Sequence, residues 1–129
     1  MISVLIGSKS DEPILQESGL LALLKNFGLD YECTVISSDR NPERLRNYCL
    51  KNKKRVQLII AIAGGVPNLP IVAKSWLPDI PVICVPIDNN SDYALAAITT
   101  PRDLPIIIVG YGKTGLQKAA YTAKQILSI

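Results

Sequence analysis

The sequence predicts an α/β fold, a three-layer α/β/α sandwich in which helices cover both faces of a five-stranded parallel sheet. Short apolar, β-branched runs alternate with helical segments along the 129-residue chain. This order is typical of doubly wound sheets. The run QLIIAIA, residues 57–63, is apolar on both faces, as a central parallel strand is when helices lie on both of its sides.

The first half of the chain supplies three strands separated by two helices. Asp11 is a natural N-cap for the first helix, Pro13 lies in its first turn, and Gly28 ends it. Asn41 is the expected N-cap of the second helix, and Pro42 takes the first helical position, which suits proline. The predicted strands are residues 2–6, 31–36 and 57–63, and the predicted helices are residues 12–27 and 42–51.

The second half continues the alternation, with helices at 69–76, 91–98 and 114–127 and strands at 81–85 and 105–110. With no repeat or linker, residues 1–129 form a single domain. Right-handed crossovers place every strand-to-helix loop at the carboxyl edge of the sheet, where such folds bind ligands. The loops at this edge are residues 7–11, 37–42, 64–68, 86–90 and 110–115.

Composition excludes several classes of protein. Hydrophobic residues make up 48% and charged residues 19% of the chain, which is typical of a globular domain. The net charge of +3 is spread along the chain, so we expect no nucleic-acid partner. The apolar runs are too short to span a membrane. Because no charged leader precedes the first strand, we expect a cytoplasmic protein, and the high apolar content predicts a homo-oligomer.

The chain contains no histidine. Its absence excludes Ser-His-Asp and Cys-His catalysis and removes the commonest metal ligand, so we expect no metal site. Proton transfer would have to use a carboxylate, lysine, tyrosine, cysteine or water. Cys33 and Cys84 lie in strand-like runs, and we expect both to be buried.

Two of the edge loops are rich in hydroxyl groups. Ser8 and Ser10 precede a helix, where free backbone N–H groups favour an anion. Ser37 is followed by Arg40, whose guanidinium can bind phosphate through two parallel hydrogen bonds. The alternative for each loop is a capped turn, in which Asp39 and Arg40 are simply solvated.

Two further loops are rich in glycine. The Gly64-Gly65 pair permits close approach of the backbone to a ligand, or else forms a tight turn that requires positive φ. Residues 110–115 match GxGxxG. A dinucleotide site, however, also requires a second strand that ends in an acidic residue about 20 residues on, and no strand pattern follows. Together the edge loops favour a phosphorylated small molecule the size of a mononucleotide.

Five motifs, in order and at the right spacing, resemble the N5-carboxyaminoimidazole ribonucleotide mutase (PurE) family of purine biosynthesis. The resemblance implies a flavodoxin-like fold, a small phosphorylated nucleotide as ligand and no metal or organic cofactor. It also implies a homo-octamer whose sites are completed by neighbouring subunits. The motifs are GSKSD (7–11), SSDRNP (37–42), AGGVPNLPI (63–71), TPRDLP (100–105) and TAKQIL (122–127).

The resemblance also implies roles for single residues. It assigns nucleotide contacts to Ser8, Ser10 and Asp11, with Asp11 on the ribose, phosphate binding to Ser37 and Arg40, and the imidazole side to Gly64, Gly65 and Asn68. Two positions depart from the family, because Asp39 and Asn68 stand where the family has histidines.

These two departures leave open whether the chain is an active enzyme. Histidine donates and accepts protons near neutral pH, whereas an aspartate, with an ordinary pKa near 3.9, serves as a base and not as an acid. The first hypothesis is an enzyme of carboxyl migration, carboxylation or decarboxylation with Asp39 in proton transfer. The alternative is a catalytically inactive nucleotide-binding or assembly paralogue. A receiver-like domain is disfavoured because the first strand ends in Gly-Ser and not in an acidic cluster.

Overall fold

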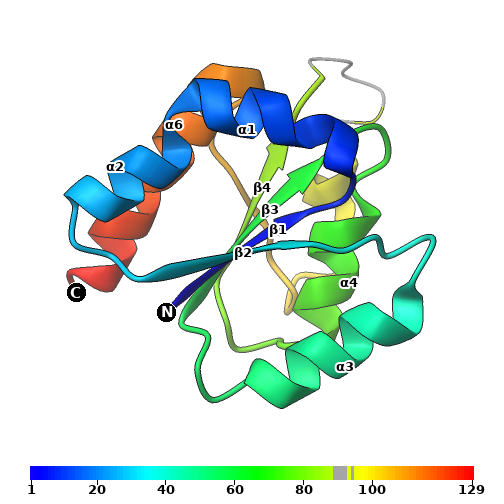
Figure 1. Ribbon diagram of the computed structural model, residues 1–129. Coiled ribbons are helices and arrows are strands. Elements are labelled where there is room, and N and C mark those ends of the chain that lie inside the picture. The colour runs from blue at the N-terminus through cyan, green and yellow to red at the C-terminus, as the bar shows by residue number, and fades with distance from the viewer. Residues whose placement is uncertain (89–92, 94) are drawn as a thin grey trace.

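One parallel sheet forms the centre of the molecule, in the strand order β2-β1-β3-β4-β5 (Figure 1). The computed structural model describes residues 1–88, 93 and 95–129. The four strand pairings are all parallel, which confirms the predicted five-stranded sheet. The strands are β1 (Ile2–Ile6), β2 (Tyr31–Val35), β3 (Leu58–Ala63), β4 (Val82–Pro86) and β5 (Ile107–Ile108).

Helices cover both faces of this sheet. On one face α6 packs against α1, α2 and β4, and on the other α3 and α4 pack together, with α4 lying against β3 and β4 (Figure 1). The helices are α1 (Glu12–Ser18), α2 (Leu20–Asn26), α3 (Pro42–Asn52), α4 (Asn68–Trp76) and α6 (Gly112–Leu127). Two short 3₁₀ turns, η1 (Lys9–Asp11) and η2 (Ala96–Thr99), complete the described elements.

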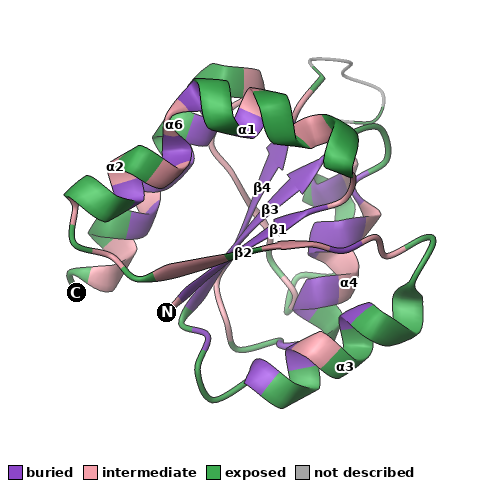
Figure 2. Cartoon of the chain, viewed as in Figure 1, coloured by how far each residue is buried: buried purple, intermediate pink, exposed green. Residues whose placement is uncertain are grey.

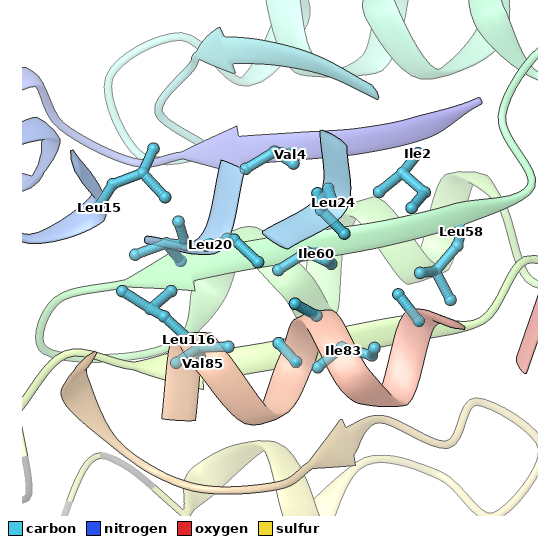
Figure 3. Close-up of a cluster of buried hydrophobic side chains, with 14 of the residues drawn as sticks. Ile2, Val4, Leu15, Leu20, Leu24, Leu58, Ile60, Ile83, Val85 and Leu116 are labelled. Atoms are coloured by element: carbon cyan, nitrogen blue, oxygen red, sulfur yellow. The ribbon is translucent and has the colours of Figure 1, made fainter. Parts of the chain in front are cut away.

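The central strands are buried on both faces because their side chains alternate between two cores (Figure 2). In β1, Val4 packs beneath α1, α2 and α6, whereas Leu5 faces the core beneath α3 and α4. Figure 3 shows the first of these cores, where Leu24 of α2 lies near Ile60 of β3 and Leu116 of α6 lies near Val85 of β4. Each such fully buried leucine contributes roughly 1.5–3 kcal/mol relative to an exposed one.

The predicted single helix over 12–27 is wrong. It is interrupted at Gly19, whose φ of +79° lies in the left-handed region and ends α1. The hydroxyl of Ser18 donates to the carbonyl of Leu15 at 2.6 Å and accepts from the N–H of Leu20 at 3.1 Å. The serine therefore satisfies groups that the interruption leaves without helical partners.

Both predicted N-caps occupy the expected positions without forming the expected bonds. Neither Asp11 nor Asn41 makes a side-chain capping hydrogen bond. Asp11 has helical backbone angles because a 3₁₀ turn precedes it, whereas a capping residue normally has extended ones. Both side chains thus lack the capping role that the sequence predicted.

Burial of Cys33 was also predicted, and this prediction is wrong. Cys84, in the central strand β4, is buried, but Cys33 is exposed because β2 is an edge strand with β1 as its only partner. The predicted helix over 91–98 lies partly outside the described residues, and its described end is the 3₁₀ turn η2. The loop 86–90 also lies partly outside them. None of the helices that the structure describes is long and apolar enough to cross a membrane.

Candidate functional site

A cavity of about 430 Å³ opens at the carboxyl edge of the sheet, among the loops that follow β1, β2 and β3. In this strand order the connections reverse direction between β1 and β3, and flavodoxin-like sheets bind ligands at that point. Seven of the residues predicted for the site line the cavity: Ser8, Ser10, Asp11, Ser37, Asp39, Arg40 and Gly64.

The loop after β1 contributes two hydroxyl groups and a carboxylate. The Ser8 and Ser10 hydroxyls are hydrogen-bonded to each other at 2.9 Å, and the Ser8 hydroxyl also accepts the backbone N–H of Ser10 at 3.3 Å. The 3₁₀ turn η1 brings Asp11 to the same wall. The loop is therefore a capped turn, in agreement with the alternative interpretation, and its hydroxyls still face the cavity.

The loop after β2 contacts the first loop through Arg40. The Ser37 hydroxyl accepts the backbone N–H of Arg40 at 3.1 Å. The Arg40 guanidinium in turn donates through Nη2 to the carbonyl of Gly7 at 3.0 Å. A guanidinium carries five N–H donors, so this one bond orients the group and leaves other donors for a ligand.

The same loop contacts the third loop through the side chain of Asp39. The amide Nδ2 of Asn68 donates to Oδ1 of Asp39 at 3.0 Å, although the two residues are 29 positions apart. The two residues at which the motifs were expected to depart from the resembled family are thus hydrogen-bonded to each other. Asn68 itself is outside the cavity wall and reaches it only through this bond.

Gly64 and Gly65 have different roles in the third loop. Gly64 lines the cavity, and a Cβ atom there would lie 3.7 Å from Oδ2 of Asp11. Gly65 has a φ of +65° and is outside the wall, so the tight-turn alternative holds for this residue. Val66, which the sequence did not single out, lines the cavity and is 49% exposed. Val66 lies within the motif AGGVPNLPI, but an apolar side chain in a loop has no polar chemistry that would mark it as a ligand contact.

Two carboxylates share this cavity, in different surroundings. Burial raises the pKa of the Asp11 carboxyl above its usual range, and the negative charge of Asp88 raises it further. Asp39 is exposed and accepts the amide of Asn68. The cavity thus offers a hydrogen-bonded carboxylate on one side and a carboxyl with increased proton affinity on the other.

The loop at 110–115 plays no part in the cavity wall. A Cβ atom on Gly115 would lie 2.5 Å from the backbone carbon of Gly110 and 3.1 Å from Cγ1 of Val85, so the GxGxxG spacing reflects close packing of the start of α6 against the preceding loop and β4. Among residues 1–88, 93 and 95–129, no three potential metal ligands converge.

The sheet order and the hydroxyl- and guanidinium-lined cavity at this edge define a doubly wound α/β protein with a candidate ligand site beside β1 and β3. The family follows from the sequence as a whole. Residues 1–129 match the family model described as AIR carboxylase, so the chain belongs to the AIR carboxylase, or PurE, family. The resemblance stated from the motifs is confirmed.

Similar proteins in other organisms agree with this assignment. The N5-carboxyaminoimidazole ribonucleotide mutase of Pyrococcus abyssi is 40% identical over 99% of this chain and 74% of its own length. The mutase of Saccharolobus solfataricus is 38% identical over 99% and 81%. The phosphoribosylaminoimidazole carboxylase of Saccharomyces cerevisiae is 33% identical over 98% of this chain, which corresponds to 22% of that longer protein.

Solved structures agree on the fold. The crystal structure of Treponema denticola PurE superposes with a TM-score of 0.76 at 22% identity, covering 94% of this chain and 78% of that one. A variant of Treponema denticola PurE2 superposes with a TM-score of 0.81, also at 22% identity, covering 98% and 79%. The flavodoxin-like architecture is therefore confirmed by independent structures.

Proposed function

We propose that the protein binds a phosphoribosyl-aminoimidazole nucleotide in the cavity and catalyses carboxyl migration or carboxylation on its imidazole ring, a step of purine biosynthesis. One observation supports this most directly. The hydroxyl groups, the guanidinium and Asp39, which accepts a hydrogen bond from Asn68 behind the wall, meet in one cavity of about 430 Å³, at the motif positions of a family whose related members are mutases and carboxylases.

Each wall of the cavity has a proposed role in binding. Ser37 and Arg40 bind the phosphate, because a guanidinium and hydroxyls match its oxygen atoms. Ser8 and Ser10 provide further hydroxyl contacts. Asp11 accepts hydrogen bonds from the ribose.

The imidazole ring has a separate proposed place. It lies against Gly64, where the lack of a side chain leaves room for a flat ring, and Gly65 forms the adjoining turn. Asn68 is close to the same place through its bond to Asp39.

The proposed carboxyl migration neither consumes nor releases a proton overall, so it requires no external proton donor. In carboxyl migration the exocyclic nitrogen loses CO₂ and gains a proton, while the ring carbon gains CO₂ and loses a proton. A single base that accepts the ring proton therefore suffices, provided that the proton returns to the nitrogen directly or through water. We assign this role to Asp39, oriented by the amide of Asn68 at 3.0 Å.

The same proposal extends to assembly and location. We propose a cytoplasmic homo-oligomer, with an octamer as the expected size. Ile98 is 64% exposed and Tyr121 is 51% exposed. Contact with other copies would remove these large apolar side chains from water. Sedimentation-velocity analysis of the purified chain measures the oligomer directly.

The test is a direct assay with synthetic N5-carboxyaminoimidazole ribonucleotide, following the carboxylated product by ultraviolet absorbance. A parallel reaction with 5-aminoimidazole ribonucleotide and bicarbonate tests carboxylation. We expect turnover in one of these reactions and its loss in Asp39→Asn, whereas Asp30→Asn, at an exposed position outside the cavity and outside the five motifs, retains it. Tight nucleotide binding without turnover would instead establish the inactive paralogue.

A further inference from the structure

A second groove, of about 300 Å³, opens at the same sheet edge, beside the candidate site. It lies between the loops that follow β1 and β2. Ser8, Ser37 and Arg40 line both hollows, so the groove and the cavity are adjacent and share a wall. Lys9, Asn41 and Arg44 line the groove and are absent from the wall of the cavity.

The groove is strongly cationic. Lys9, Arg40 and Arg44 are among its lining residues, which include no acidic residue. Within the described part of the chain, the ion pairs are Arg55–Glu32 and Lys113–Glu17. The three cations of the groove take part in neither, so their charge is available to an anionic ligand.

Both arginines are held in place by backbone carbonyls at the ends of strands. Arg40 donates to the carbonyl of Gly7, and Arg44 donates through Nη1 to the carbonyl of Val35, each at 3.0 Å. Each bond uses one of five guanidinium N–H donors. The ordering cost of the side chains is thus reduced before a ligand arrives, which favours binding.

We propose that this groove is a second anion subsite, which binds a phosphate group next to the one held by Ser37 and Arg40. The phosphate has two potential sources: a second phosphoryl group of the same ligand, or a free phosphate ion beside a bound monophosphate. The proposal relies on the phosphate role assigned to Ser37 and Arg40 but not on turnover.

The test compares inorganic phosphate with pyrophosphate by isothermal titration calorimetry, so that no base or ribose is needed. Pyrophosphate reaches both subsites, and we expect it to bind about tenfold more tightly than phosphate, the equivalent of one charge-assisted hydrogen bond. Arg44→Ala and Lys9→Ala each remove most of this advantage. Lys51→Ala, which removes one positive charge from the far end of α3, retains it.

A second titration distinguishes the two sources. Phosphate is added to protein saturated with 5-aminoimidazole ribonucleotide. Binding that Arg44→Ala abolishes identifies free phosphate as the occupant, whereas exclusion of phosphate, with the pyrophosphate advantage intact, identifies a second phosphoryl group.

Equal affinity of the unaltered protein for phosphate and pyrophosphate would overturn the proposal, as would an equal loss in Lys51→Ala. A protein that neither binds nor converts the nucleotide, yet keeps the pyrophosphate advantage, would contradict the proposed function alone.

Discussion

Replacing Gly115 by alanine tests whether the GxGxxG loop is shaped by packing of the start of α6 against Gly110 and β4. The added Cβ atom would lie 2.5 Å from the backbone carbon and 2.6 Å from the carbonyl oxygen of Gly110, and 3.1 Å from Cγ1 of Val85. Because two of these three atoms belong to the backbone, no side-chain rotation relieves the contact. The loop and the first turn of α6 have to separate.

The expected cost follows from this geometry. Overpacking costs about 1–3 kcal/mol, and contacts this short against backbone place Gly115→Ala at about 3 kcal/mol. For a domain of this size the melting temperature falls by about 10 °C. Urea denaturation followed by circular dichroism measures the free energy of unfolding. An m-value equal to that of the unaltered protein shows that both proteins expose the same surface on unfolding, so that the two free energies can be compared.

A matched control separates packing from backbone strain. Gly19 has a φ of +79°, and a Cβ atom added there would have no neighbouring atom within 4 Å. Gly19→Ala therefore suffers only the left-handed backbone penalty of about 1–2 kcal/mol. A loss in Gly115→Ala no greater than that in Gly19→Ala would refute the packing explanation and return the loop to consideration as a ligand site.

Three further predictions concern the cavity and the thiols. Asn68→Ala is expected to lower turnover about fivefold, because it removes a hydrogen bond of about 1 kcal/mol to Asp39. An unchanged kcat would contradict the orienting role. Cys33 is expected to react first with a thiol reagent at pH 8, because it is exposed while burial raises the pKa of Cys84 to about 12. Mass spectrometry identifies the labelled cysteine, and early labelling of Cys84 would contradict this. Finally, burial raises the pKa of Asp11, so the folded state loses stability as pH rises from the unfolded pKa of 3.8 through the folded value. Asp11→Asn is therefore expected to raise the melting temperature at pH 7 and not at pH 3, and equal melting temperatures at pH 7 would contradict the shift.

The order of elements was predictable because each strand and helix has its own local pattern. QLIIAIA indicated a strand covered on both faces, and β3 is buried throughout. The position of a strand within the sheet is not local. Nothing in the residues around Cys33 distinguishes an edge strand from an inner one, and for that reason its exposure was missed. Gly19 interrupts a pattern that its apolar neighbours continue, so periodicity alone joined α1 and α2.

The candidate site was likewise predictable only where local sequence patterns determine it. Since parallel strands all end at one edge, Ser8, Ser37 and Gly64 were expected together, and they line one cavity. The hydrogen bond between Asn68 and Asp39 was not expected. The two residues lie 29 positions apart on different loops, and only the folded chain brings their side chains together. The apolar part of the wall, such as Val66, was not singled out, because apolar side chains have no polar chemistry that marks them as ligand contacts.

The loop after β2 contacts both of its neighbours through consecutive residues, Asp39 toward the third loop and Arg40 toward the first. The loop after β1 and the loop after β3 are therefore connected to each other through the loop after β2. A rotation of one peptide unit there would loosen both sides of the cavity at once. A change of ligand specificity is thus expected to require the fewest substitutions in the loop after β2, because one substitution there alters the contacts of all three loops that form the cavity.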